Sequence, residues 1–118
     1  MEFGVTVLPD PPHTVMLDRL ARAEANGFTY GWTYDSHVLW QECFPLLTAM
    51  THRTSTMKAG LCVTNPGTRE PTVLASAHAT VHDISGGRVV LGVTGVTSPA
   101  GRSGSSLSEW PSTRPPAG

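Results

Sequence analysis

Two short polar segments carry the residue types that could do chemistry, and each follows an apolar run typical of a β-strand. In the segment 34–40, Asp35 and His37 can orient a ring or move a proton, and Trp40 can cover a planar cofactor. The segment 63–69 offers a hydroxyl, an amide and a guanidinium, which suit a flavin-like ring or a phosphate. The two segments together predict a site for a planar cofactor.

Each segment also has a purely structural interpretation. Asp35 can cap a loop, His37 can be solvated, and Trp40 can be part of the core. The run Thr-Asn-Pro-Gly that begins at Thr64 is explained equally well by turn chemistry. From the residues alone, both interpretations stay open.

Other polar residues favour structural roles. His78 and His82 lie four positions apart on one predicted helix, the spacing of a metal pair, but the sequence places no third ligand beside them. We therefore expect a solvated helix surface there and no metal site. Cys62 stands in an apolar run and is expected to be a small core residue, because nothing near it would lower its pKa.

An alternation of strands and helices must position these residues. Period-2 or fully apolar runs predict strands, and 3.6-residue periodicity predicts helices. The strands are expected at 2–8, 28–34, 58–63 and 89–91, and the helices at 15–25, 44–50 and 71–84. Thr14 is a plausible N-cap for the first helix, Asn26-Gly27 ends it, and Pro71 opens the third.

Units of about 30 residues imply parallel strands joined by right-handed crossovers. Both a (β/α)8 barrel and an open doubly wound sheet begin in this way. The first strand is not followed by G-x-G-x-x-G, which argues against a Rossmann dinucleotide site. In a barrel, the segments 34–40 and 63–69 would lie just beyond the carboxyl ends of the strands, where active sites are built.

Composition excludes several classes of partner. The net charge of −1 over 118 residues provides no basic surface for nucleic acid or for an anionic membrane. The two cysteines, Cys43 and Cys62, make no disulfide framework, and the N-terminus does not have the pattern of a signal peptide. We expect a cytoplasmic protein.

The composition changes after Gly92. Residues 1–92 hold nearly all the large apolar side chains, whereas residues 93–118 are rich in Ser, Pro, Gly, Arg and Thr. We expect a folded partial barrel domain over 1–92, then a non-native tail over 93–118 that is disordered from about Ser98.

Three ordered tracts carry a family resemblance: Tyr30-Gly-Trp-Thr-Tyr-Asp-Ser-His-Val-Leu-Trp40, Val63-Thr-Asn-Pro-Gly-Thr-Arg69 and Gly86-Gly-Arg-Val-Val-Leu-Gly92. Over residues 1–92 the chain resembles the bacterial luciferase-like oxidoreductases, most closely the branch that uses the deazaflavin coenzyme F420, with FMN as the alternative. The resemblance implies the N-terminal half of a TIM barrel, with four parallel strands and three helices. It also implies hydride transfer between a small-molecule substrate and the cofactor ring.

The resemblance implies roles for individual residues. Asp35 and Trp40 match positions at the cofactor and substrate face, and Ser36 or His37 stands where many members carry a histidine. The family's non-proline cis peptide, in a bulge of the third strand that backs the ring, would fall at Cys62-Val63. The implied assignment is then complete: Asp35, His37 and Trp40 are catalytic, and Cys62, Val63, Thr64, Asn65 and Arg69 bind the cofactor.

The same resemblance suggests why the tail differs. Family members continue with a Gly-Arg-Gly-Asp-Ser-Ala-like loop and a Gly-x-Lys-Pro helix start, and a one-nucleotide shift of the reading frame after Gly92 would restore both. On this hypothesis the chain is a frameshifted, truncated and inactive oxidoreductase domain. The alternative function is a non-catalytic fragment that at most self-associates through exposed strand edges.

Overall fold

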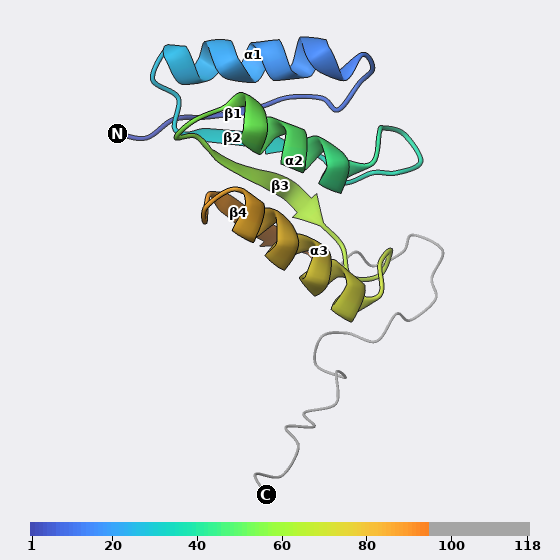
Figure 1. Ribbon diagram of the computed structural model, residues 1–118. Helices are drawn as coiled ribbons and strands as arrows, with labels where there is room; N and C mark the ends of the chain where they lie inside the picture. The colour runs from blue at the N-terminus through green and yellow to red at the C-terminus, as the bar shows by residue number, and fades with distance from the viewer. Residues whose placement is uncertain (95–118) are drawn as a thin grey trace, which may run out of the picture.

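The computed structural model describes residues 1–94, and these form one four-stranded parallel sheet with three helices (Figure 1). In chain order the elements are β1 Gly4–Thr6, α1 His13–Ala25, β2 Tyr30–Thr33, α2 Cys43–Arg53, β3 Lys58–Thr64, α3 Pro71–Ile84 and β4 Val89–Val93. The strands lie in the order β1-β2-β3-β4, so every crossover joins neighbouring strands. The predicted alternation is therefore confirmed. The predicted disordered stretch from Ser98 lies outside the described residues.

The three helices pack on one face of the sheet (Figure 1). Their buried side chains meet those of β3 and β4 in a single core. The members with the lowest exposure are large aliphatic residues: Met16, Leu20, Leu47, Met50, Met57 and Leu61. Burial of these side chains is the main favourable contribution to the stability of this layer.

The ends of the elements follow local chemistry, and most of the predicted bounds need correction: only α3 matches its predicted range at both ends. Helix α1 begins at His13 with Pro12 as its N-cap, so the prediction of Thr14 as the cap is wrong. The extended backbone of Pro12 already offers its carbonyl to the N–H of Val15, at 3.1 Å. Helix α2 begins at Cys43, because the Glu42 carboxylate accepts the N–H of Phe44.

Strand β4 continues two residues beyond the predicted 89–91, through the composition boundary at Gly92. Val93 pairs with Thr64, and the N–H of Thr94 donates to the Thr64 carbonyl at 3.1 Å. The strand therefore reaches the carboxyl end of β3.

Strand β3 is irregular where the resemblance placed a bulge. The peptide Cys62-Val63 is cis, as the resemblance implied. The pairing of β3 with β4 changes register between Leu61 and Thr64, so two residues of β3 lie opposite Gly92 alone. Within residues 1–94, no helix has the length and apolar character needed to span a membrane.

Candidate functional site

Asp35 lies at the centre of a polar cluster at the carboxyl ends of β2 and β3. Its carboxylate accepts hydrogen bonds from Arg69, from Nε at 3.2 Å to Oδ2 and from Nη2 at 3.0 Å to Oδ1. The Thr64 hydroxyl donates to Oδ2 at 2.6 Å. The Asp35 side chain is only 2% exposed, so these protein groups largely replace water around the charge.

Arg69 joins this carboxylate to the start of α2. Its Nη2 group donates to Glu42 Oε1 at 2.5 Å and to Cys43 Sγ at 3.3 Å. The guanidinium carbon also lies 5.0 Å from the ring centroid of Phe44, the geometry of a cation–π contact. One guanidinium thus fixes the loop after β3 against the loop after β2.

The electrostatics of the cluster keep Asp35 ionised. Burial raises the pKa of Asp35, but hydrogen bonds from Arg69 and Thr64 and the Arg69 charge outweigh it, so this pKa lies below its ordinary value. The hydrogen bond to Asp35 raises the pKa of Arg69. Burial, followed by the Asp35 charge, raises the pKa of Cys43, which stays a neutral thiol. Asp35 therefore has the environment of a structural anion and not of a proton donor.

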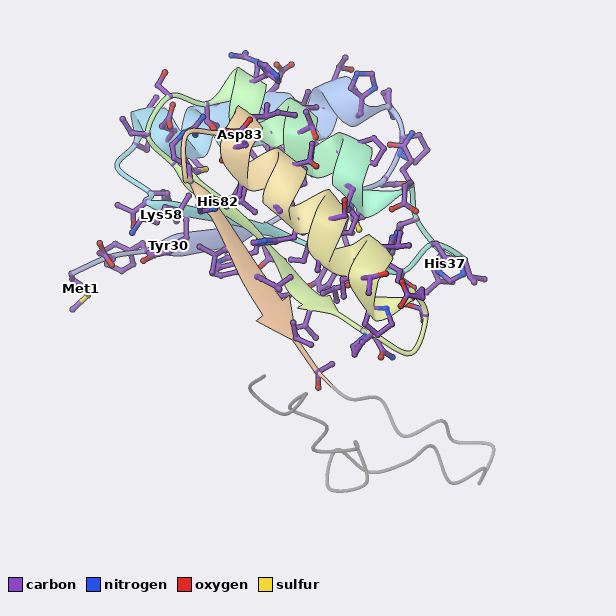
Figure 2. The ribbon with its side chains drawn as sticks, turned by 60° about the horizontal axis from the view of Figure 1, so that its bottom comes forward. Met1, Tyr30, His37, Lys58, His82 and Asp83 are labelled. Carbon is purple, nitrogen blue, oxygen red and sulfur yellow. The ribbon has the colours of Figure 1, made fainter. Side chains whose placement is uncertain are left out.

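His37 and Trp40 lie outside this hydrogen-bonded cluster. His37 is exposed in the β2–α2 loop, at the carboxyl end of the sheet (Figure 2). Trp40 is half-buried, and its backbone N–H donates to the Ser36 carbonyl at 2.9 Å, which closes the turn. The loop also exposes Val38 and Leu39, by 82% and 72%.

The segment after the β3 bulge divides between two roles. Thr64 is buried in the cluster, whereas Asn65 makes a turn: its Oδ1 accepts the N–H of Gly67 at 2.7 Å. This turn is the alternative interpretation that the sequence left open. At the bulge itself Cys62 is half-buried, and the Val63 side chain is 40% exposed.

Sequence reasoning missed the contribution of α2. Glu42 and Phe44 both bind Arg69, and neither was a candidate. The available signal was weak: an acidic residue just before a helix is a common cap, but its second partner lies 27 positions away.

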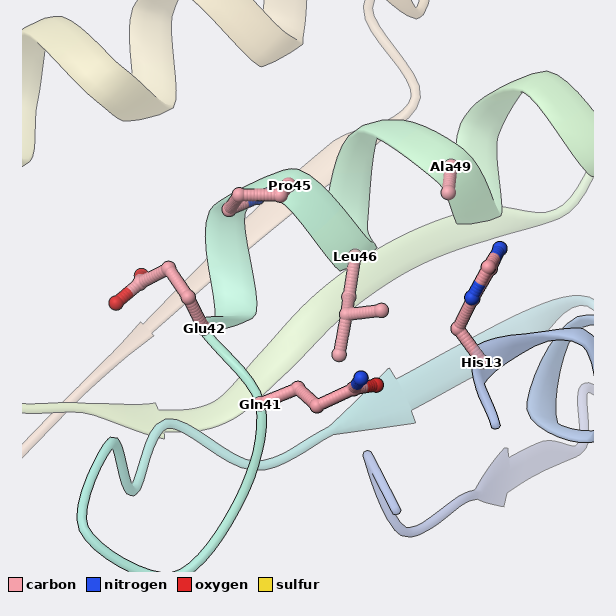
Figure 3. Close-up of a pocket in the computed structure, with 6 residues that line it drawn as sticks. All are labelled: His13, Gln41, Glu42, Pro45, Leu46 and Ala49. Atoms are coloured by element: carbon pink, nitrogen blue, oxygen red, sulfur yellow. The ribbon is translucent and has the colours of Figure 1, made fainter. Parts of the chain in front are cut away.

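A cavity of about 330 Å³ lies between the start of α1 and α2 (Figure 3). It is lined by His13, Gln41, Glu42, Pro45, Leu46 and Ala49. Glu42 is shared with the cluster, but the predicted site residues are not among the lining. We take the strand-end cluster as the candidate site, because its groups converge at the end of the sheet where barrel active sites form.

The histidine pair on α3 lies apart from the cluster. The His78 and His82 rings are 6.2 Å apart, and burial followed by the His82 charge lowers the pKa of His78. In the part of the chain that the structure describes, no group of three or more His, Cys, Asp or Glu residues could hold a metal ion.

Parallel strands, helical crossovers on one face and a polar cluster at the carboxyl ends together define an α/β protein of the (β/α)-barrel class. The sequence profile described as luciferase-like monooxygenase matches residues 1–108, a range that extends past Gly92. The chain belongs to this family.

The curated relatives include 5,10-methylenetetrahydromethanopterin reductases. The chain is 39% identical over 93 residues to the 5,10-methylenetetrahydromethanopterin reductase of Archaeoglobus fulgidus, which covers 79% of this chain and 28% of the relative. It is 40% identical over 93 residues to the same reductase from Methanopyrus kandleri, covering 79% and 26%. The chain thus spans little more than a quarter of these relatives.

Solved structures agree with the fold. The coenzyme F420 dependent tetrahydromethanopterin reductase from Methanopyrus kandleri matches with a TM-score of 0.74 and 39% identity, over 78% of this chain and 26% of that one. A type II Baeyer–Villiger monooxygenase component from Pseudomonas putida, in complex with FMN, matches with a TM-score of 0.73 and 17% identity, over 84% and 30%. The second match bears on the fold alone. The predicted family and fold are confirmed.

Proposed function

We propose that this chain supplies part of the ring-binding wall of a deazaflavin-dependent oxidoreductase domain, which transfers hydride between a small-molecule substrate and coenzyme F420. The observation that carries the proposal is the bulge of β3. It presents Val63, 40% exposed, directly before Thr64 and the Asp35–Arg69 pair. The identity of 39% to a coenzyme F420 dependent reductase supports the choice of cofactor.

The residues present fit such a ring. A deazaflavin ring system is flat and mainly apolar, with a polar edge, so it needs an apolar wall beside hydrogen-bonding groups. Val63 and the half-buried Cys62 offer the wall, and the peptide groups around Thr64 and Asn65 offer the polar rim. When bound, the ring supplies the carbon that accepts or gives the hydride.

The polar cluster has a positioning role in this proposal. Asp35, Arg69 and Thr64 hold the loops after β2 and β3 in register, because every oxygen of the Asp35 carboxylate is bonded within the chain. Proton exchange then falls to His37, which is exposed on the same loop, and Trp40 covers one side of the ring. These are the catalytic roles that we assign.

FMN is the alternative cofactor. An FMN-bound monooxygenase component shares the fold at 17% identity, whereas the F420-dependent reductase shares it at 39%. The higher identity favours F420.

A second function follows for the 118-residue polypeptide produced alone. We propose that it turns over no substrate and at most self-associates through its strand edges. Two observations support this: it spans 26–28% of its curated relatives, and Leu91 and Val93 of β4 are 39% and 52% exposed.

Equilibrium titration of the purified chain with F420, followed by deazaflavin fluorescence, tests the first proposal. We expect saturable binding that is lost on desalting, and about tenfold weaker binding by Val63→Asp. Val73→Asp is the matched control, because Val73 is also exposed but lies on α3. Absence of saturable binding, or equal weakening by both variants, would contradict a ring site at the bulge.

Two further measurements test the second proposal. Cofactor that stays with the chain through desalting, or substrate turnover, would refute the inactive fragment. Sedimentation of the chain as a monomer at every concentration would refute association through the strand edges.

A further inference from the structure

The Trp32 side chain of β2 spans three strands on the sheet face that the helices leave uncovered. A Cβ built on Gly60 of β3 would lie 2.5 Å from Cζ3 and 2.8 Å from Cε3 of the Trp32 indole. A Cβ on Gly4 of β1 would lie 3.0 Å from Nε1 and 3.3 Å from Cδ1 of the same ring. The indole therefore occupies the side-chain space of one glycine on each neighbouring strand.

The next residue, Gly31, marks the opposite face. A Cβ there would lie 2.8 Å from both Leu20 Cδ2 and Met57 Sδ, in the core beneath the helices. Because successive side chains of a strand point to opposite faces, Trp32 faces the side that forms the interior of a barrel.

A second aromatic ring fills the layer toward the amino end of the sheet. The Tyr30 ring stacks on Trp32 with 5.8 Å between centroids and 6° between planes. Lys58 Nζ lies 5.5 Å from the Tyr30 ring centroid, and both residues are at the end of the sheet away from His37 (Figure 2). The amino side of Trp32 is thus closed by stacked side chains.

The carboxyl side of Trp32 faces the bulge. Trp32 pairs with Gly60, so Cys62 lies two residues further along β3, a rise of roughly 7 Å. A group that contacts Cys62 from the interior side of the sheet would therefore lie next to the indole, on its carboxyl side. At Gly92 of β4 the bulge of β3 already fills the side-chain position, because a Cβ there would lie 2.5 Å from the Leu61 carbonyl oxygen and 3.1 Å from Val63 Cγ1.

We infer that Trp32 is a positioning residue that forms the floor of the ring site and sets how deeply a planar deazaflavin ring sits between the strands. The inference rests on the proposed function. Gly4 and Gly60 serve it indirectly, because the indole fills the space that a side chain at either position would need. At Gly60 a Cβ would also lie 2.7 Å from the Val90 carbonyl oxygen. A smaller side chain at position 32, or a methyl group at position 60 that displaces the indole, would leave space for water beneath the deazaflavin ring.

The test measures F420 affinity and the absorption band of the bound deazaflavin in four variants. Trp32→Ala and Gly60→Ala are expected to weaken binding about tenfold and to shift the band, whereas Trp32→Phe restores most of the affinity. Gly31→Ala is the matched control: it crowds the helix side of the same strand, so it lowers the urea midpoint but keeps affinity within about twofold and the band unchanged.

The outcomes separate this inference from the proposed function. If the wild-type chain binds F420 and both Trp32→Ala and Gly60→Ala bind it equally well with an unshifted band, the floor is refuted and the ring site stands. If Gly31→Ala shifts the band as much as Gly60→Ala, the effect is one of stability and the floor is refuted. If the wild-type chain itself binds no F420, the proposed function fails and the floor fails with it. Should Trp32→Ala not fold, Trp32→Phe and Gly60→Ala decide the question.

Discussion

The two ends of the sheet hold their polar side chains in different ways. At the amino end, Arg88 donates to the carbonyls of Thr51, Met57 and Ser85, and Glu24 accepts N–H groups of the segment 55–57. At the carboxyl end, by contrast, the bonds of the Asp35–Arg69 cluster join side chain to side chain.

This difference indicates a division of roles. Bonds to the main chain satisfy the groups that the end of α2 and the start of β3 leave unpaired, so they contribute chiefly to stability. Bonds between side chains fix two loops relative to one another while leaving exposed groups such as His37 and Val63 on them. The carboxyl end is thus organised for binding, as barrel enzymes in general are.

The largest effect on stability is expected at Arg88. Replacement by Ala leaves several carbonyls without a partner, and we expect a loss of about 2–4 kcal/mol in the free energy of unfolding. Urea denaturation measures it, with exposed Arg22→Ala as the control. A loss of less than about 0.5 kcal/mol in the free energy of unfolding would contradict the stabilising role assigned to the amino end.

For Asp35→Asn we expect a smaller loss in the free energy of unfolding, about 2 kcal/mol, because the half-buried Arg69 keeps Glu42 as a partner. A double-mutant cycle with Arg69→Met is expected to give a coupling of about 1–2 kcal/mol, measured by urea denaturation. F420 affinity should fall in both single variants, since the loops lose their register. If the stability losses of the two variants are additive and F420 affinity is unchanged, the Asp35–Arg69 pair does not position the two loops.

Glu24 makes the amino end sensitive to acid. Burial raises the pKa of Glu24, but backbone N–H groups of Thr56, Met57 and Ser55 outweigh it, so this pKa lies below its ordinary value of 4.5. The stabilising contribution is thus complete above the unfolded-state pKa, near 4.5, and is lost as the pH falls through the lower folded-state pKa. Glu24→Gln should cost about 1 kcal/mol at pH 7, with the difference from wild type shrinking below about pH 4.5. Urea midpoints of both proteins at a series of pH values measure this difference. A difference that grows as the pH falls would contradict the lowered pKa of Glu24.

The smallest effect on stability is expected at His37. It is exposed, so His37→Ala should change the free energy of unfolding by less than about 0.5 kcal/mol. Thermal or urea denaturation measures this change. A larger change would show that the His37 side chain stabilises the loop, and would contradict its assignment as an exposed group that exchanges a proton.

Much of the fold could be predicted from sequence, because it rests on local signals. The predicted span of α3, opened by Pro71, matches the structure, and Gly27 takes the positive φ of 91° expected after α1. Strand ends were less predictable: whether Val93 belongs to β4 depends on its pairing with Thr64, a contact made across the sheet.

The sequence predicted which residues come together in the site, but not the hydrogen bonds that they make with one another. Residues after parallel strands converge by topology, so Asp35, Thr64 and Arg69 meet as expected. Their pairing with one another, and the third partner Glu42, depend on where α2 starts. The position of the Trp32 indole depends on glycines 28 residues away on each side, which no local pattern reports.

Chemical-shift mapping of the backbone amides during titration with F420 tests the division of roles most directly. We expect the largest shifts at the carboxyl end, in residues 62–65 and in the loop that begins at Asp35, and no change in residues 55–57 and 85–88. Shifts concentrated at the amino end, or distributed evenly over both ends, would contradict it.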